Sequence, residues 1–227
     1  MNATIYSNTT IIGTVSLQVG DESMGCLFGK FIPNENYFKD IQKSVWEFWS
    51  TNNPDYNKWH SLRLNALLDN GFFLFPEGGF TFDDSPEFPN TTIRIDIAGA
   101  DIALFNFSNK ILLEPWYTIS INQKIIYEDE LFKEITPDTS FFYLPTINKS
   151  NKHPLIGAKY SAFAKYGPND DVLFLVTKNG ESSRFAIVHL TWSGSGNQHF
   201  PSAKFYLDFD EFLNKRMIPD NLEWTTY

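Results

Sequence analysis

The chain has 227 residues, of which 42% are hydrophobic and 17% are aromatic, including 22 Phe, 10 Tyr and 6 Trp. This composition excludes a disordered chain and predicts a globular protein whose core is rich in aromatic rings. The formal net charge of −9 opposes binding to nucleic acid, because phosphates require a basic surface, and it suits a basic protein partner.

Cys26 is the only cysteine, so the chain cannot form an intramolecular disulfide, and we interpret this residue as part of a strand rather than as a reactive thiol. The first residues lack a basic segment followed by an apolar run, and no stretch approaches the roughly 18 apolar residues of a membrane span. We therefore expect a cytosolic protein that does not bind a membrane.

The first part of the chain predicts a hairpin followed by a helix. Residues 10–19 and 24–31 are typical of strands, and a Gly-Asp-Glu-Ser turn separates them. Apolar side chains then recur at helical spacing from Tyr37 to Ser50, on a segment that we expect to pack on a sheet. The cluster Asn52-Asn53-Pro54-Asp55 is expected to end this helix, because proline cannot continue the hydrogen-bond ladder.

The middle of the chain, from Trp59 to Glu128, predicts short strands joined by tight turns. Alternation of Ile93, Ile95 and Ile97 with charged residues indicates a strand with one buried face. The predicted hairpin turns are Asp69-Asn70-Gly71, Ser108-Asn109 and Asn122-Gln123. We expect adjacent strands to pair antiparallel, as a meander.

The last part of the chain predicts a second group of strands and a closing helix. The expected strands are 155–166, 171–177, 184–192 and 203–206. Asp208 is a suitable cap for a helix that continues to Met217, and Pro219 is expected to end that helix.

Two lobes are expected, because residues 137–154 contain three prolines and few periodic apolar positions. The prediction is a larger N-terminal α+β lobe, residues 1–148, packed with a smaller C-terminal α+β lobe, residues 149–227. The fold class is therefore α+β, mostly an antiparallel sheet meander with two amphipathic helices.

The residues that catalysis requires do not form a recognisable motif. The four histidines, at positions 60, 153, 189 and 199, are too far apart for a spaced metal motif, and no Gly-x-Ser-x-Gly sequence is present. We predict no metal and no cofactor. His189 is the candidate acid or base of a hydrolase, although a half-buried strand histidine bonded to a backbone carbonyl is the more ordinary interpretation.

Two acidic clusters are candidate partner-binding sites. One is expected in a loop and the other at a junction between a strand and a helix, where each would ordinarily be a solvated surface or a helix N-terminal charge effect. The alternative is an anionic patch that steers a cationic protein into place, with nearby rings as anchors. The predicted partner-binding residues are Asp83, Asp84, Glu87, Glu128, Asp129, Glu130 and Trp192.

The C-terminal part of the chain resembles bacterial immunity-type proteins, which are encoded beside polymorphic toxins and neutralise them by binding. The resemblance lies in the run from Phe185 to Ser193, which contains His189-Leu190-Thr191-Trp192, in Phe200-Pro201, and in the helical sequence from Phe209 to Met217. It implies a stoichiometric inhibitor without turnover and without a cofactor, and it assigns no role to an individual residue.

These observations together predict a cytosolic protein-binding module, of the immunity type, whose partner is a basic protein such as a toxin. Two alternatives remain open: a hydrolase that uses His189 as acid or base, and a carbohydrate- or ligand-binding protein with an exposed strip of Trp and Tyr. Pairing of edge strands leaves a homodimer open as well.

Overall fold

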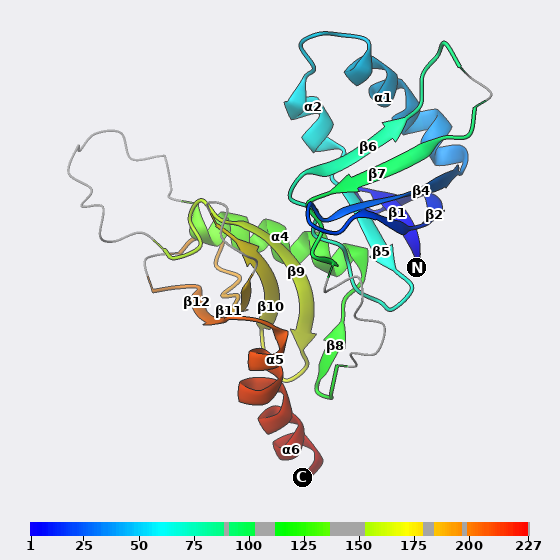
Figure 1. Ribbon diagram of the computed structural model, residues 1–227. Coiled ribbons are helices and arrows are strands. Elements are labelled where there is room, and N and C mark those ends of the chain that lie inside the picture. Colours follow the sequence, from blue (N-terminus) through cyan, green and yellow to red (C-terminus); the bar gives the residue numbers. More distant parts are fainter. Residues whose placement is uncertain (89–90, 103–111, 137–152, 179–183, 197–198, 227) are drawn as a thin grey trace, which may run out of the picture. The chain divides into compact units, whose positions relative to one another are not determined.

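The computed structural model describes residues 1–88, 91–102, 112–136, 153–178, 184–196 and 199–226. The chain divides into two compact units, Met1–Lys110 and Ile111–Tyr227, and each has its own antiparallel sheet (Figure 1). The predicted α+β class, with mostly antiparallel strands, is confirmed.

The two units differ in extent from the predicted lobes, which met between residues 148 and 149. Strand β8 (Trp116–Thr118) and helix α4 (Ile121–Ile135) belong to the second unit. The reason is that β8 pairs with β9, and that Glu128 on α4 accepts a hydrogen bond from the backbone of Ala162 at 3.0 Å. Contacts between elements, rather than the proline content of a stretch, decide where a unit ends.

The sheet of the first unit is not a simple meander, because its fifth strand returns to pair with its first. The order is β5-β1-β2-β4-β7-β6, and β3 also pairs with β4. Every pairing is antiparallel, and β4 with β2 and β3 confirms the predicted opening hairpin. The strands are β1 (Asn2–Ser7), β2 (Thr10–Ser16), β3 (Gln18–Asp21), β4 (Cys26–Pro33), β5 (Leu64–Leu68), β6 (Gly79–Asp83) and β7 (Arg94–Ala98).

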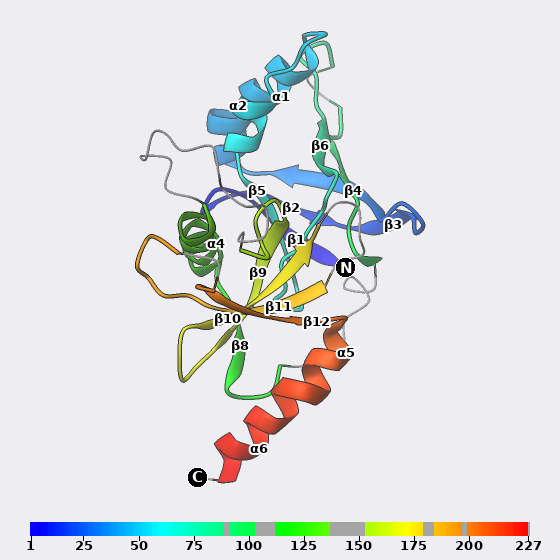
Figure 2. The same cartoon turned by 90° about the vertical axis from the view of Figure 1, so that its left-hand side faces the viewer.

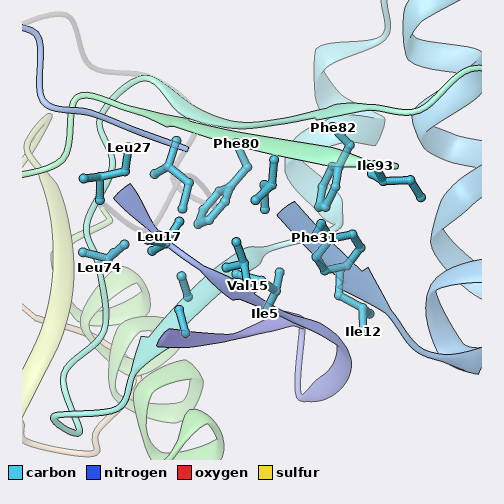
Figure 3. Packing of buried hydrophobic residues seen from close by; sticks show 14 of the residues in the cluster. Ile5, Ile12, Val15, Leu17, Leu27, Phe31, Leu74, Phe80, Phe82 and Ile93 are labelled. Atoms are coloured by element: carbon cyan, nitrogen blue, oxygen red, sulfur yellow. The ribbon is translucent and has the colours of Figure 1, made fainter. Parts of the chain in front are cut away.

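The core of the first unit is built from one face of this sheet (Figure 3). Phe31 is buried in this core, with its ring centroid 5.1 Å from those of both Tyr37 and Phe82. The alternation predicted around Ile95 is confirmed, since Ile95 and Ile97 are fully buried in β7.

A helix covers this core, as predicted, but it begins with a wider turn. The segment consists of the π-helical turn η1 (Tyr37–Ile41) and helix α1 (Gln42–Trp49). A second, short helix, α2 (Tyr56–Ser61), follows, and Figures 1 and 2 both show it beside α1. It was not predicted, because the sequence reading took Asp55 only as part of a helix end, whereas its carboxylate caps the next helix by accepting from the backbone of Lys58.

The second unit has a true meander of strands in the order β12-β11-β10-β9-β8, so the prediction of antiparallel neighbours is confirmed here. The strands after β8 are β9 (Lys159–Tyr166), β10 (Asp171–Thr177), β11 (Arg184–His189) and β12 (Ser202–Tyr206). The predicted hairpin at Ser108-Asn109 lies outside the residues that the structure describes.

The predicted hairpin at Asn122-Gln123 is wrong, because both residues lie in the first turn of α4. The start of this helix is fixed by a capping box, in which Ser120 accepts from the backbone of Gln123 and the Gln123 side chain accepts from the backbone of Ser120. Tyr127, Leu131 and Ile135 then recur every four residues on the buried side.

The prediction that Pro219 ends the last helix is also wrong. Helix α5 (Phe209–Phe212) continues through the π-helical turn η2 (Leu213–Met217) into helix α6 (Ile218–Thr226). A π-helical turn shifts the hydrogen-bond ladder by one residue, so Pro219 lies in the first turn of a new α-helical segment, where its missing N–H is tolerated. The predicted cap is confirmed, since Asp208 accepts from the backbone of Glu211 at 2.8 Å.

Candidate functional site

The first acidic cluster contains one residue that is directed inward. Asp84 follows β6 and continues its alternation, so that Phe80, Phe82 and Asp84 point to the same buried side. Only 6% of Asp84 is exposed. Its Oδ2 atom accepts hydrogen bonds from the hydroxyl of Tyr37 at 2.8 Å and from the amide of Gln42 at 3.1 Å.

The bond to Asp84 also affects the Tyr37 hydroxyl. Burial raises the pKa of the Tyr37 hydroxyl far above its ordinary value, and the bond to Asp84 raises it further. Tyr37 therefore keeps its proton, and its O–H donates a hydrogen bond to Oδ2 of Asp84. The other oxygen, Oδ1, accepts no hydrogen bond from the described residues.

Asp84 lines a pocket of about 340 Å³ between the η1–α1 segment, β4 and the residues that precede β7. The walls are largely apolar, and Ile32 and Phe38 on them are 59% and 54% exposed. Lys30 is the other charged residue of the lining. The full lining is Lys30, Phe31, Ile32, Pro33, Phe38, Gln42, Asp84, Thr91, Thr92 and Ile93.

The other two members of this cluster lie on the surface. Asp83 is exposed at the end of β6 and faces Arg94 across the strand pair, and Glu87 is exposed in the following turn. Neither residue lines the pocket. The three acids are therefore neighbours in sequence that the fold separates into one buried carboxylate and two solvated ones.

The second acidic cluster lies within α4 rather than at a junction between a strand and a helix. Glu128 pairs with the buried ammonium of Lys124, and its carboxylate also accepts from the backbone of Ala162. Glu130 is buried, whereas Asp129 is exposed. Two of these three acids thus hold the second unit together.

Glu130, predicted as a partner-binding residue, contacts the loop that carries Trp192, another residue of that prediction. Glu130 accepts from the backbone of Gly194 at 3.2 Å and from Lys133 at 3.2 Å. One turn along the helix, Glu134 accepts from the backbone and the hydroxyl of Thr191 at 2.8 and 2.6 Å. In the sequence, Trp192 lies between Thr191 and Gly194, whose backbones these bonds hold. Its φ is 55°, a conformation that non-glycine residues adopt only when the surroundings hold it.

His189 lies at the end of β11 in a network of charged groups. Its Nδ1 donates to Oδ1 of Asp171 at 2.8 Å, and the guanidinium of Arg216 donates to the other oxygen at 3.2 Å. Arg216 also donates to Asp220 at 2.8 Å, and Asp220 accepts from the indole of Trp116 at 2.7 Å. The interpretation of His189 as a strand histidine bonded to a backbone carbonyl is therefore wrong, because its partner is the carboxylate of Asp171.

This network does two things in the fold. It ties the last helix to the sheet, since Arg216 and Asp220 lie on η2 and α6 while Asp171 begins β10. It also sets the tautomer of His189, whose Nε2 atom is left as an acceptor on a half-exposed ring. Asp171, His189 and Ser202 are register partners on three adjacent strands, so their side chains leave the same face of the sheet.

His153 has a structural role beside this region. It is buried, and its Nδ1 accepts from the backbone of Leu155 at 3.2 Å while its Nε2 bonds the carbonyl of Pro201 at 2.7 Å. These roles require the neutral ring, with the proton on Nε2. Burial lowers the pKa of His153, in agreement with that state.

Tyr37, Gln42, Asp171 and Arg216 are the site residues that the sequence reading missed. The sequence contains a signal only for Asp84, the residue to which Tyr37 and Gln42 donate. The pattern Phe80-x-Phe82-x-Asp84 continues an inward alternation and so predicts a buried carboxylate that needs donors. The contacts of Asp171 arise from strand register and from a helix 45 residues away, which leave no local pattern.

Across the described residues, no group of His, Cys, Asp and Glu is arranged to hold a metal ion. The helices in this part of the chain are also too short or too polar to cross a membrane. Comparisons with known protein families, with curated proteins and with solved structures found no match to this chain.

Proposed function

We propose that this chain is a cytosolic protein-binding module that neutralises a basic partner by stoichiometric binding, as an immunity protein does. The observation that carries this proposal is the exposed apolar surface of α6. Met217 and Asp220 are buried, and Trp224, the next residue along the same side of the helix, is 52% exposed. Leu222, which is 61% exposed, lies on the opposite side of the helix, because residues two apart are separated by about 200° around its axis.

A helix of this kind is more stable when a partner covers it. The last helical segment runs without a break from α5 through η2 into α6, and packing of an apolar face supplies most of the stability of a protein helix. Figures 1 and 2 show α6 extending beyond the strands of its unit, so its last turns have little sheet beneath them. Trp224 is the type of side chain that supplies much of the binding energy at protein interfaces.

The charge of this segment supports a basic partner. Asp208, Asp210 and Glu223 are exposed along α5 and α6. The basic side chains of the segment are engaged within it, since Lys215 pairs with Glu211 and Arg216 pairs with Asp220. Opposite charge on a partner raises the association rate and excludes partners of like charge.

The test pairs the full chain with the product of the gene encoded beside it, which the proposal expects to be a toxin. We expect protection of cells that express both proteins, and a 1:1 complex from the two purified components by light scattering. Trp224→Ala should weaken the complex about tenfold or more, and Thr225→Ala, an exposed polar position on the same helix, should not. Protection that is lost equally in both variants, or a toxin that remains fully active beside excess protein, would refute the proposal.

The contact between His189 and Asp171 favours a second candidate function, hydrolysis. An oriented imidazole with a free Nε2 acts as a general base toward water or a hydroxyl, and Ser202 is the nearest hydroxyl by register. Assays with activated esters test this candidate. His189→Ala should abolish turnover that Thr225→Ala leaves unchanged, and a rate equal to the uncatalysed one in the unmodified protein would eliminate it.

A further inference from the structure

We propose that the pocket at Asp84 binds the guanidinium group of an arginine side chain that the basic partner presents. This inference rests on the proposed function for the source of the arginine, but its chemistry is carried by the first unit alone. The pocket combines a buried carboxylate, one oxygen of which accepts no hydrogen bond from the described residues, and apolar walls that reach the surface.

The carboxylate is incompletely satisfied. A buried charge is costly unless hydrogen bonds or an opposite charge compensate it, and Asp84 receives both of its donors on one oxygen. Tyr37 and Gln42 thus orient the group and hold Oδ2 in place. Oδ1, which has no donor among the residues described, is the oxygen with which a ligand in the pocket would bond.

The walls suit an arginine better than a small inorganic cation. Ile32, Pro33 and Ile93 provide apolar surface for the aliphatic stem, and the ring of Phe38 is exposed at the same pocket. Guanidinium groups are weakly hydrated and stack on aromatic rings, whereas ammonium groups and metal ions keep their water more strongly. The volume of about 340 Å³ lies within the range of ligand-binding pockets.

Substitution of Lys30 should have the opposite effect on arginine binding to substitution of Asp84. Its ammonium group also lines the pocket, and no salt bridge joins it to Asp84 in the described structure. A bound cation would be repelled by Lys30 and attracted by Asp84. Removal of the lysine charge should therefore tighten binding, while removal of the aspartate charge should weaken it.

The test measures binding of N-acetyl-arginine amide to the full chain by NMR titration, with the citrulline analogue as a neutral probe of the same shape. We expect the arginine probe to bind at least tenfold more tightly than the citrulline probe, as a charge-assisted hydrogen bond requires. Asp84→Asn should remove that preference, and Lys30→Gln should strengthen arginine binding about twofold to threefold. Asp83→Asn makes the same change of net charge outside the pocket and should leave the preference unchanged.

Equal binding of the two probes would overturn the inference, as would equal losses in Asp83→Asn and Asp84→Asn. Thermal unfolding of each variant shows whether a loss reflects a damaged fold, and Tyr37→Phe, which keeps the carboxylate, provides a second variant that should retain the preference. The two proposals fail differently. If the toxin complex depends on Trp224 but not on Asp84, the arginine pocket is refuted and the binding module stands; if the arginine probe binds and no complex forms, the reverse holds.

Discussion

Asp84 in the first unit and Asp171 in the second are both buried carboxylates, but donors reach them differently. Asp171 uses both oxygens, one for His189 and one for Arg216, so its charge is matched inside its own unit. Asp84 receives Tyr37 and Gln42 on a single oxygen. The difference shows that burial alone does not make an acid structural, because an unmatched oxygen beside a pocket is available to a ligand.

Among the substitutions that test this comparison, Asp171→Ala is expected to reduce the free energy of unfolding most. The substitution leaves Arg216 and His189 without their shared acceptor, and we expect the free energy of unfolding to fall by about 3 kcal/mol, measured by urea denaturation. Asp170→Asn, at an exposed neighbouring position, should change that free energy by less than about 0.5 kcal/mol. Equal effects in the two variants would mean that the network does not stabilise the second unit.

Tyr37→Phe tests the surroundings of Asp84, the other carboxylate in this comparison. The variant loses one neutral donor to Asp84 while Gln42 remains, so the free energy of unfolding should fall by about 1 kcal/mol. Tyr56→Phe removes an exposed hydroxyl of the same kind and should have no measurable effect. A loss as large as that of Asp171→Ala would show that Asp84 depends on its donors as heavily as Asp171 does.

His153 gives the smallest expected effect, which depends on pH. Its pKa is lowered in the folded protein, so the folded state favours the neutral ring. Its contribution to stability should be complete above the unfolded pKa of about 6.5 and should be lost progressively as the pH falls below it. His153→Gln should flatten this part of the curve of unfolding free energy against pH, whereas His60→Gln, at an exposed position, should leave its slope as it is.

Elements with one clear period could be predicted from the sequence. The alternation around Ile95 and the helical spacing after Tyr37 each describe a segment that packs one face on a core, and both were confirmed. Helix α4 was missed because Asn122-Gln123 resembles a turn between two apolar runs, although the Ser120-x-x-Gln123 capping box was the better signal.

The candidate site could be predicted only in part. Asp84 was identified as an acid of interest, but its neighbours Asp83 and Glu87 suggested a solvated loop, and only the alternation with Phe82 distinguishes it from them. The pairing of His189 with Asp171 depends on the register of β10 with β11. Register is set by packing of the whole sheet, so a sequence of this length contains no local mark of it.

The bond between Glu128 and the backbone of Ala162 also protects the sheet from other chains. Strand β8 pairs with only the last residues of β9, from Ala164 to Tyr166, so Ala162 lies on a stretch of β9 that β8 does not cover. An uncovered strand edge is a template for unwanted pairing, and a carboxylate that occupies the amide there blocks it. Loss of Glu128 should therefore expose this stretch of β9 and promote aggregation.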